Sequence, residues 1–135
     1  MEFRRFSLSN GIRVVVAPMT RVSTVALQVW LSCGSRGEQD HEAGLAHMNE
    51  HMFFRGGRDF PDSKRVDREL WLLGESYNAF TDYEHVIYFI ITSPHFLARA
   101  AHLLSDMLIH ARFDAECFET AITRLVVPLK KNSAG

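Results

Sequence analysis

The sequence predicts an α+β fold, a largely antiparallel sheet covered by helices on one side. Three observations predict it: strand-like and helical segments follow one another in the order strands, helices, strands, helices; hairpin signals join the strands; and no repeated crossovers occur. The 135 residues suit a single domain. We expect this domain to occupy residues 1–128, with residues 129–135 as a tail.

Three antiparallel strands are expected first. Residues 3–9 alternate weakly, Asn10-Gly11 is a strong hairpin signal, and residues 12–17 follow as a β-branched run. Residues 23–33 alternate more clearly. The apolar residues of this third strand share one face: Val25, Leu27, Val29 and Leu31.

Four helices and two further strands are expected in the rest of the chain. The strands span residues 77–81 and 85–92. The first helix ends near the glycines at 56 and 57, and the second, capped by Asp62 or Ser63, is closed by Gly74. A long helix starts at Ser93-Pro94, and a last one runs from Asp114 toward Val127, until Pro128 interrupts it.

Composition argues against several classes of partner. The net charge is -1 and no basic patch suits a nucleic acid. The longest apolar run, residues 86–91, is far shorter than the roughly 20 residues of a membrane helix. The N-terminus has no apolar secretory region, and Cys33 and Cys117 lack a metal-binding spacing. We therefore expect a cytoplasmic protein with no nucleic-acid or membrane partner.

The most informative stretch is residues 44–57, GLAHMNEHMFFRGG, with His47, Glu50 and His51 in the order H-x-x-E-H. At about 1.5 Å and about 100° per helical residue, the two histidines lie about 6 Å apart on one stripe, with Glu50 beside them. Two imidazoles so placed can bind one zinc ion and leave room for a third ligand and a water. Glu50 is better placed to take a proton from that water than to ligate. The opposite stripe is predicted to face the core: Leu45, Met48 and Met52.

Short motifs also occur by chance, so these five residues do not by themselves separate a catalytic site from incidental histidines. The surrounding sequence adds further motifs in a fixed order. They are Leu8-Ser9-Asn10-Gly11, Gly34-Ser35-Arg36 with Glu38, residues 44–57, Asn78-Ala79-Phe80-Thr81, Glu84-His85 with Tyr88, and Phe113-Asp114.

Together these motifs resemble the N-terminal domain of the pitrilysin, insulysin and mitochondrial processing peptidase family of zinc metallopeptidases. The resemblance covers about residues 6–118 and implies zinc as the cofactor. It implies His47 and His51 as metal ligands and Glu50 as the general base. It also implies that Asn78 and Ala79 lie on a strand whose edge pairs with an extended peptide substrate.

The chain departs from the family pattern at the third metal ligand. The resemblance places a glutamate there, on the last helix, but the position falls on Lys130 and a supporting glutamate falls on Thr123. Pro128 also breaks the helix just before this position. Glu84, expected on a strand near the site, stays open as a substitute ligand.

The second departure is length, because family members continue through further domains and a companion half. We expect a truncated zinc metalloendopeptidase domain, weakly active or inactive alone. The alternative is a non-catalytic subunit that binds extended peptides or docks on a partner. The expected partners are a peptide or protein substrate and either a second copy of the chain or a second peptidase-like subunit.

Overall fold

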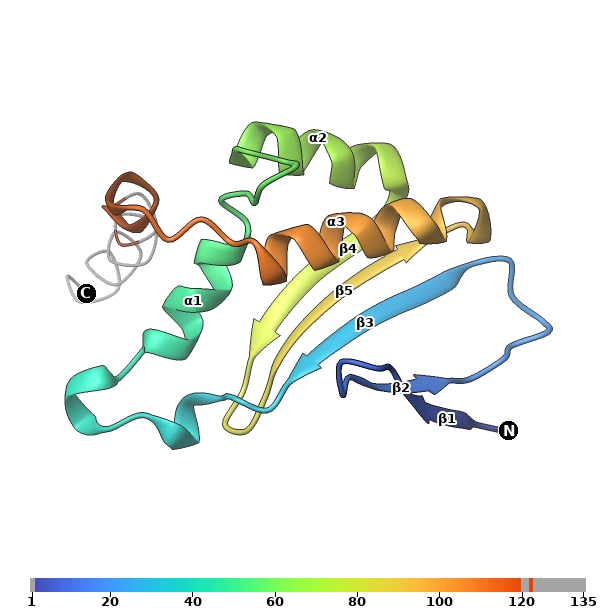
Figure 1. Cartoon of the computed structure of the whole chain (residues 1–135), viewed down its shortest axis with the longest axis horizontal. Helices are drawn as coiled ribbons and strands as arrows, with labels where there is room; N and C mark the ends of the chain where they lie inside the picture. Colours follow the sequence, from blue (N-terminus) through green and yellow to red (C-terminus); the bar gives the residue numbers. More distant parts are fainter. Residues whose placement is uncertain (1, 120–121, 123–135) are drawn as a thin grey trace, which may run out of the picture.

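The structure is a computed structural model that describes residues 2–119 and residue 122. Helices pack on one face of a three-stranded sheet, and a two-stranded hairpin forms a second, separate sheet (Figure 1). The α+β architecture and its antiparallel pairing agree with the prediction. None of the helices in the described residues combines the length and hydropathy that a transmembrane span requires.

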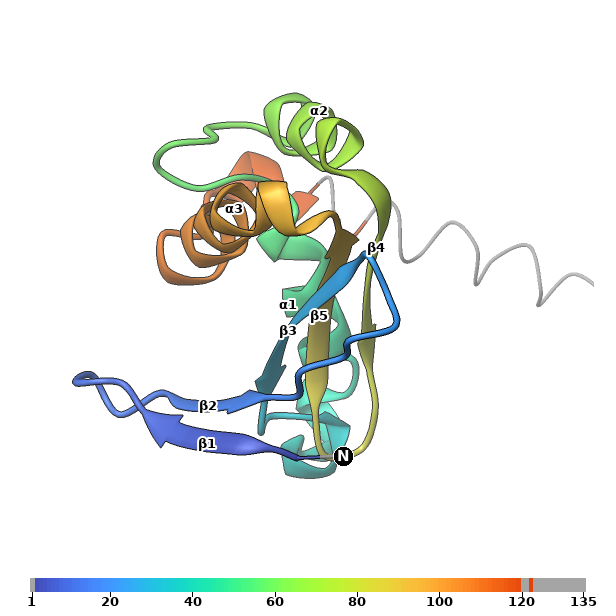
Figure 2. The same ribbon diagram turned by 90° about the vertical axis from the view of Figure 1, so that its right-hand side faces the viewer.

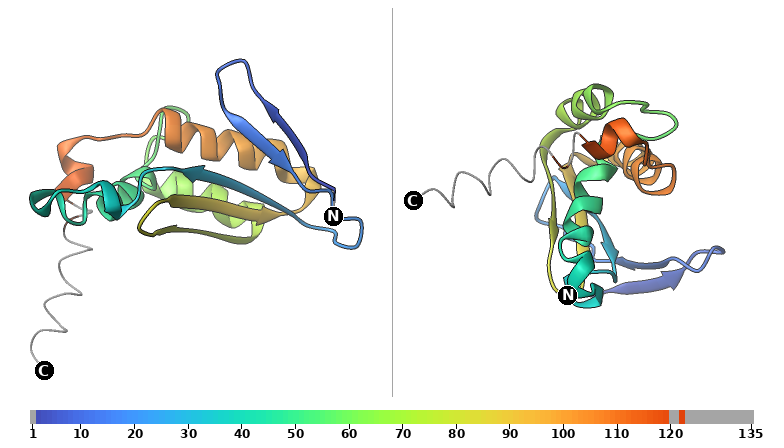
Figure 3. Two further views of the ribbon diagram at one scale, coloured as in Figure 1. Left: turned by 90° about the horizontal axis from the view of Figure 1, so that it is seen from below. Right: turned by 90° about the vertical axis from the view of Figure 1, so that its left-hand side faces the viewer.

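The N-terminal hairpin consists of β1 (Arg4–Ser7) and β2 (Arg13–Val16). Its turn is built as predicted: Gly11 has a φ of 87°, and the side chain of Asn10 accepts a hydrogen bond from the Ile12 N–H. The hairpin projects away from the main sheet, which Figures 2 and 3 show from three further directions.

The three strands expected first are all present, but they lie in two different sheets. β3 (Val25–Leu31) pairs with β5 (Val86–Thr92) and not with the hairpin. β3 and β5 match over seven register pairs, and β1 and β2 match over four.

The main sheet has the strand order β3-β5-β4, so β5 is central and β4 (Gly74–Thr81) is an edge. β5 is apolar along its whole length, as expected for a strand with neighbours on both sides. The register of β4 on β5 shifts between Gly74 and Ser76, which marks a bulge at the start of β4.

Two helices cover this sheet. α2 (Ser63–Leu73) begins at Asp62, whose side chain accepts a hydrogen bond from the Arg65 N–H, and ends at Gly74 with a φ of 91°. Both predicted caps are confirmed. α3 (Leu97–Ile109) follows a single 3-10 turn, η3 (Pro94–Phe96). The two helices and β5 enclose the core: Val66, Leu70, Leu73, Val86, Tyr88, Ile90, Ala100, Leu103, Leu104 and Met107.

The last helix begins as expected. Residues 115–119 are helical, and the carboxylate of Asp114 accepts a hydrogen bond of 2.8 Å from the Cys117 N–H. Its predicted continuation to Val127, Pro128 and the tail at residues 129–135 lies outside the described residues.

Candidate metal centre

The H-x-x-E-H stretch forms α1 (Leu45–Phe53), preceded by the 3-10 turns η1 (Ser35–Gly37) and η2 (Asp40–Glu42). Gly44 enters the helix with a φ of 94°, a conformation that glycine adopts most readily. No side chain at Gly44 can cap the helix. Glu38 takes this part, because its carboxylate accepts hydrogen bonds from the Gly44 N–H (2.8 Å) and the Ala46 N–H (2.6 Å).

The predicted inner stripe of this helix is confirmed for two of its three residues. Met48 and Met52 are buried. Leu45 was also expected to face the core, but it is exposed in the first turn of the helix, outside the cluster that Met48 and Met52 form with Cys117 and Ile122.

The structure brings His47, Glu50 and His51 together. The Nε2 atoms of the two histidines are 3.2 Å apart, and one ligand atom from each of the three residues lies within 4.8 Å of the others. In a tetrahedral zinc site with Zn–N bonds of about 2.0–2.1 Å, the two nitrogens are about 3.3 Å apart. The distance between the two Nε2 atoms therefore matches the spacing that a shared zinc ion requires.

The carboxylate of Glu50 is fixed by the sheet. The hydroxyl of Thr81, the last residue of β4, donates a hydrogen bond of 2.6 Å to Oε2 of Glu50. Glu50 is half-buried, and one of its carboxylate oxygens lies within 4.8 Å of a ring nitrogen of each histidine. Sequence reasoning included Thr81 in a motif but gave it no role. Period-two alternation along β4 could have shown that Thr81 shares the face of Ala79.

Tyr88 lies below this carboxylate, fully buried on β5. Its ring packs edge-on against Phe53 of α1, with 5.5 Å between the ring centroids. Burial raises the pKa of the Tyr88 phenol well above its ordinary value, and the negative charge of Glu50 raises it further. Tyr88 therefore stays protonated and neutral beside the cluster.

Asn78 and Ala79 lie on β4, the strand expected to hold a peptide. Its outer side pairs with no strand in the described part of the chain. The Ala79 N–H donates a hydrogen bond of 2.9 Å to the side-chain oxygen of Asn78. The exposed side chain of Asn78 thus satisfies this backbone donor.

Glu84, the candidate substitute for the third ligand, does not join the histidines in one cluster, and the position of the family glutamate lies outside the described residues. Glu84 was expected on a strand, but it lies in the turn between β4 and β5. There it forms an ion pair of 2.5 Å with Arg36. It does not belong to the group that His47, Glu50 and His51 form within the described residues. Lys130 and Thr123 lie outside the described residues.

The turn that carries Glu84 is held against the end of β3. The Ser35 N–H donates to the Asp82 carbonyl (3.0 Å), and the Arg36 N–H donates to the Tyr83 carbonyl (2.8 Å). A side chain at Gly34 would collide with the backbone of this turn. The close approach explains why glycine precedes the Ser35-Arg36 pair.

The profile of Insulinase (Peptidase family M16) matches residues 13–131, most of the chain. The chain belongs to the insulinase (M16) peptidase family. The solved structure of a protease from Helicobacter pylori aligns with a TM-score of 0.86 and 26% identity, over 96% of this chain and 30% of that one. This likeness agrees with the α+β fold.

Two M16 relatives illustrate the sequence similarity. The mitochondrial-processing peptidase subunit beta of Dictyostelium discoideum is 35% identical over 118 residues, which are 87% of this chain and 25% of the relative. The uncharacterized zinc protease YmxG of Bacillus subtilis is 32% identical over 111 residues, 82% of this chain and 27% of the relative. The chain thus spans about a quarter of the length of these two relatives.

Proposed function

We propose that this M16 chain supplies the zinc-binding half-site and the general base of a metalloendopeptidase. The observation that carries the proposal is the pair of Nε2 atoms 3.2 Å apart, with the carboxylate of Glu50 beside them. A zinc ion held by His47 and His51 would polarise a peptide carbonyl and lower the pKa of a water. The name of the relative YmxG, a zinc protease, supports the choice of metal.

Glu50 acts as the proton carrier in this proposal. Its Oε2 accepts a hydrogen bond from the Thr81 hydroxyl, which makes Oε1 the more basic oxygen and the one to which we assign the proton of the attacking water. Glu50 then returns the proton to the amine of the cleaved bond, as one residue serving first as base and then as acid. Tyr88 adds no charge, because its phenol stays neutral.

The substrate is an extended peptide or protein segment that adds a strand to the free edge of β4. Such pairing uses backbone hydrogen bonds and so reads side chains only in local pockets. Asn78 and Ala79 are the β4 residues that we propose to contact it, next to the strand end at Thr81 that touches Glu50.

Two imidazoles alone form a weak zinc site, since zinc sites usually have three or four protein ligands. The position of the family glutamate carries Lys130, so we propose that the chain alone has little or no activity. A second copy or a second peptidase-like subunit could supply the missing carboxylate and close the site. The name of one relative, a subunit beta, agrees with a multi-subunit arrangement.

The alternative function is a non-catalytic M16 subunit that binds peptides or docks on a partner. Lys130 is the observation that favours it, because a cation at the ligand position repels a metal ion. The two proposals predict different effects of a chelator on peptide binding and hydrolysis. Peptide binding that continues unchanged after chelator treatment, without any hydrolysis in zinc, supports the non-catalytic subunit.

Zinc titration of the metal-stripped protein, in competition with a coloured chelator, tests the proposal. We expect one weakly bound zinc per chain, lost in His47→Ala and His51→Ala but retained in Glu50→Gln. His102→Ala is the matched control, because His102 lies on α3 and hydrogen-bonds Asp59. Any hydrolysis should fall about 10²–10⁴-fold in Glu50→Gln. Zinc binding that is absent, or equal in His51→Ala and the unaltered protein, would contradict the proposed site.

A further inference from the structure

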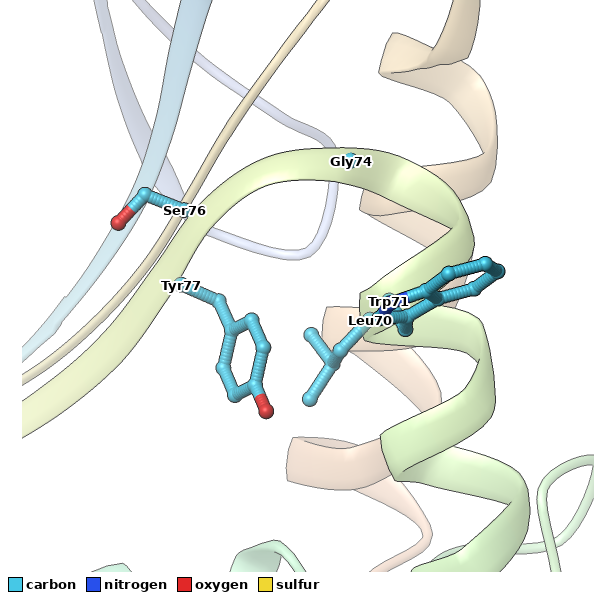
Figure 4. A pocket seen from close by; sticks show the side chains of 5 residues that line it. All are labelled: Leu70, Trp71, Gly74, Ser76 and Tyr77. Carbon is cyan, nitrogen blue, oxygen red and sulfur yellow. The ribbon is translucent and has the colours of Figure 1, made fainter.

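A hollow of about 510 Å³ lies where α2 turns into β4, away from the histidines. Its lining is Leu70, Trp71, Gly74, Ser76 and Tyr77. In Figure 4 the Leu70 side chain lies between the ring of Tyr77 and the indole of Trp71, below the arch of the chain at Gly74. The volume falls within the range of about 300–1,000 Å³ that is usual for ligand pockets.

The hollow is bordered by two aromatic side chains that the domain leaves in solvent. Trp71 is 77% exposed and Tyr77 is 43% exposed, while Leu70 is buried and forms the floor. Aromatic side chains offer a large apolar area together with a polar tip, which makes them frequent at binding surfaces. Their place here is suited to a large apolar side chain of a ligand.

The hollow lies at the start of β4, the edge strand of the main sheet. Tyr77 and Thr81 are both on this strand, four residues apart, which is about 13 Å at about 3.3 Å per residue. The register shift between Gly74 and Ser76 ends regular pairing just beyond Tyr77. A peptide that pairs with β4 from Thr81 onward therefore reaches the hollow at the point where regular pairing with β4 ends.

Strand geometry also decides which peptide side chain enters. Tyr77, Ala79 and Thr81 share one face of β4, and Figure 4 shows Ser76 pointing away from Tyr77. Residues directly opposite each other on paired strands project to the same face. The peptide residue opposite Tyr77 thus projects beside Tyr77, four residues from the one opposite Thr81 and Glu50.

The direction of the peptide follows from the sheet. Every strand pair in the described residues is antiparallel, and antiparallel pairing is the more stable per residue. A peptide antiparallel to β4 runs from Thr81 toward Tyr77. The residue at the hollow is then on the C-terminal side of the residue at Glu50.

We propose that the Trp71–Tyr77 hollow is a specificity site for an aromatic or large aliphatic side chain, four residues C-terminal to the peptide residue held at Thr81. This inference rests on the proposed function for the identity of the ligand, an extended peptide. It concerns a region that contains none of the proposed metal ligands, so it can be tested with and without zinc.

The fluorescence of Trp71 reports on binding in the hollow. In a Trp30→Phe background, Trp71 is the single tryptophan, and its emission should shift to shorter wavelength when a side chain covers it. The probes are ten-residue polar peptides with one Phe, compared with the same peptides carrying Ala. In metal-free protein we expect the Phe peptide to bind about tenfold more tightly. Equal binding of both peptides would overturn the proposal.

Matched variants distinguish peptide binding in the hollow from non-specific binding to exposed aromatic side chains. Binding of the two peptides to Trp71→Ala, followed by peptide anisotropy, should lose the tenfold difference. Tyr83→Ala should keep it, because Tyr83 is equally exposed, at 75%, but lies in the β4–β5 turn. His51→Ala should also keep it, so a failure of the zinc site leaves this test intact. Loss of the difference in Tyr83→Ala, or its survival in Trp71→Ala, would overturn the proposal.

The register is tested in zinc-loaded protein with peptides that carry an N-terminal mercaptoacetyl group to anchor them at the metal. Phe at the fourth residue should bind more tightly than Phe at the third or fifth, whose side chains face the other way. Equal affinity at all three positions would overturn the assigned spacing. A gain seen only with peptides anchored by a C-terminal hydroxamate would overturn the assigned direction.

Discussion

The hydroxyl of Thr81 donates a hydrogen bond of 2.6 Å to Oε2 of Glu50, a residue 31 positions earlier in the chain. This bond joins the last residue of β4 to the second turn of α1 and sets the carboxylate beside the two imidazoles. β4, the strand that we propose to bind a peptide, also holds the carboxylate of Glu50. The position of the bound peptide and the position of this carboxylate are therefore linked.

Thr81→Val removes this hydrogen bond with little change of shape. A hydrogen bond to a charged group is worth about 1.5–3 kcal/mol when buried, and Glu50 is only half-buried, so we expect a loss of about 1 kcal/mol in unfolding free energy. Guanidinium unfolding in chelator measures it as a lower midpoint with an unchanged slope.

Thr81→Ser is the matched control for this prediction, since it keeps the hydroxyl and removes only a methyl group. Thr81→Ser should therefore keep most of the stability that Thr81→Val loses. A Thr81→Val protein as stable as Thr81→Ser would show that the bond to Glu50 does not stabilise the fold.

Glu38 makes the start of α1 sensitive to acid. The backbone N–H groups of Ala46 and Gly44, in that order of importance, lower the pKa of the Glu38 carboxyl below its ordinary value of 4.5. A carboxyl whose pKa is lower in the folded protein stabilises it above the unfolded pKa, and this contribution is lost as pH falls through the folded pKa. Stabilisation by Glu38 is therefore complete above about pH 4.5 and declines below it.

Glu38→Gln removes the charge and keeps the shape. At pH 7 we expect this variant to melt at a lower temperature than the unaltered protein, and we expect the difference to shrink below about pH 4.5. Thermal unfolding between pH 3 and pH 7 measures both effects. The matched control is Glu2→Gln at an exposed position, and a difference that stays constant with pH would contradict the role of the charge.

Local features of the structure were largely predictable. The Asn10-Gly11 turn, the Asp62 cap and the Gly74 stop depend on a few neighbouring residues, and each is where the sequence places it. The approach of His47 to His51 is equally local, because the helical repeat sets it.

Pairing between distant segments was not predictable from periodicity. Alternation shows that residues 23–33 favour a strand, but it does not say that the partner is β5 rather than the hairpin. The bond from Thr81 to Glu50 depends on how α1 packs on β4. The cap by Glu38 depends on the course of the five residues, 39–43, that separate it from Gly44. Such contacts carry no repeating signal in the sequence.

Asp106 is the buried carboxylate that fixes the loop following α1. It is only 2% exposed on α3, and its two oxygens accept hydrogen bonds from three backbone N–H groups, those of Arg58 (3.2 Å), Asp59 (3.0 Å) and Phe60 (3.1 Å). A side chain at Gly57 would collide with this carboxylate. The end of the motif helix is thereby tied to the long helix of the core.

Asp106→Ala leaves these three N–H groups without their acceptor. At about 1 kcal/mol for each bond, we expect a loss of about 3 kcal/mol in unfolding free energy. Guanidinium unfolding of metal-free protein measures the loss, and Ser105→Ala, at the exposed neighbouring position, is the control and should differ little from the unaltered protein. Asp106→Asn should fall between the two, because it keeps one acceptor oxygen and places an amide donor against the remaining N–H groups. An Asp106→Ala protein within about 0.5 kcal/mol of the unaltered protein would mean that the loop is held by its other contacts, such as the bond from the Gly57 N–H to the Phe60 carbonyl.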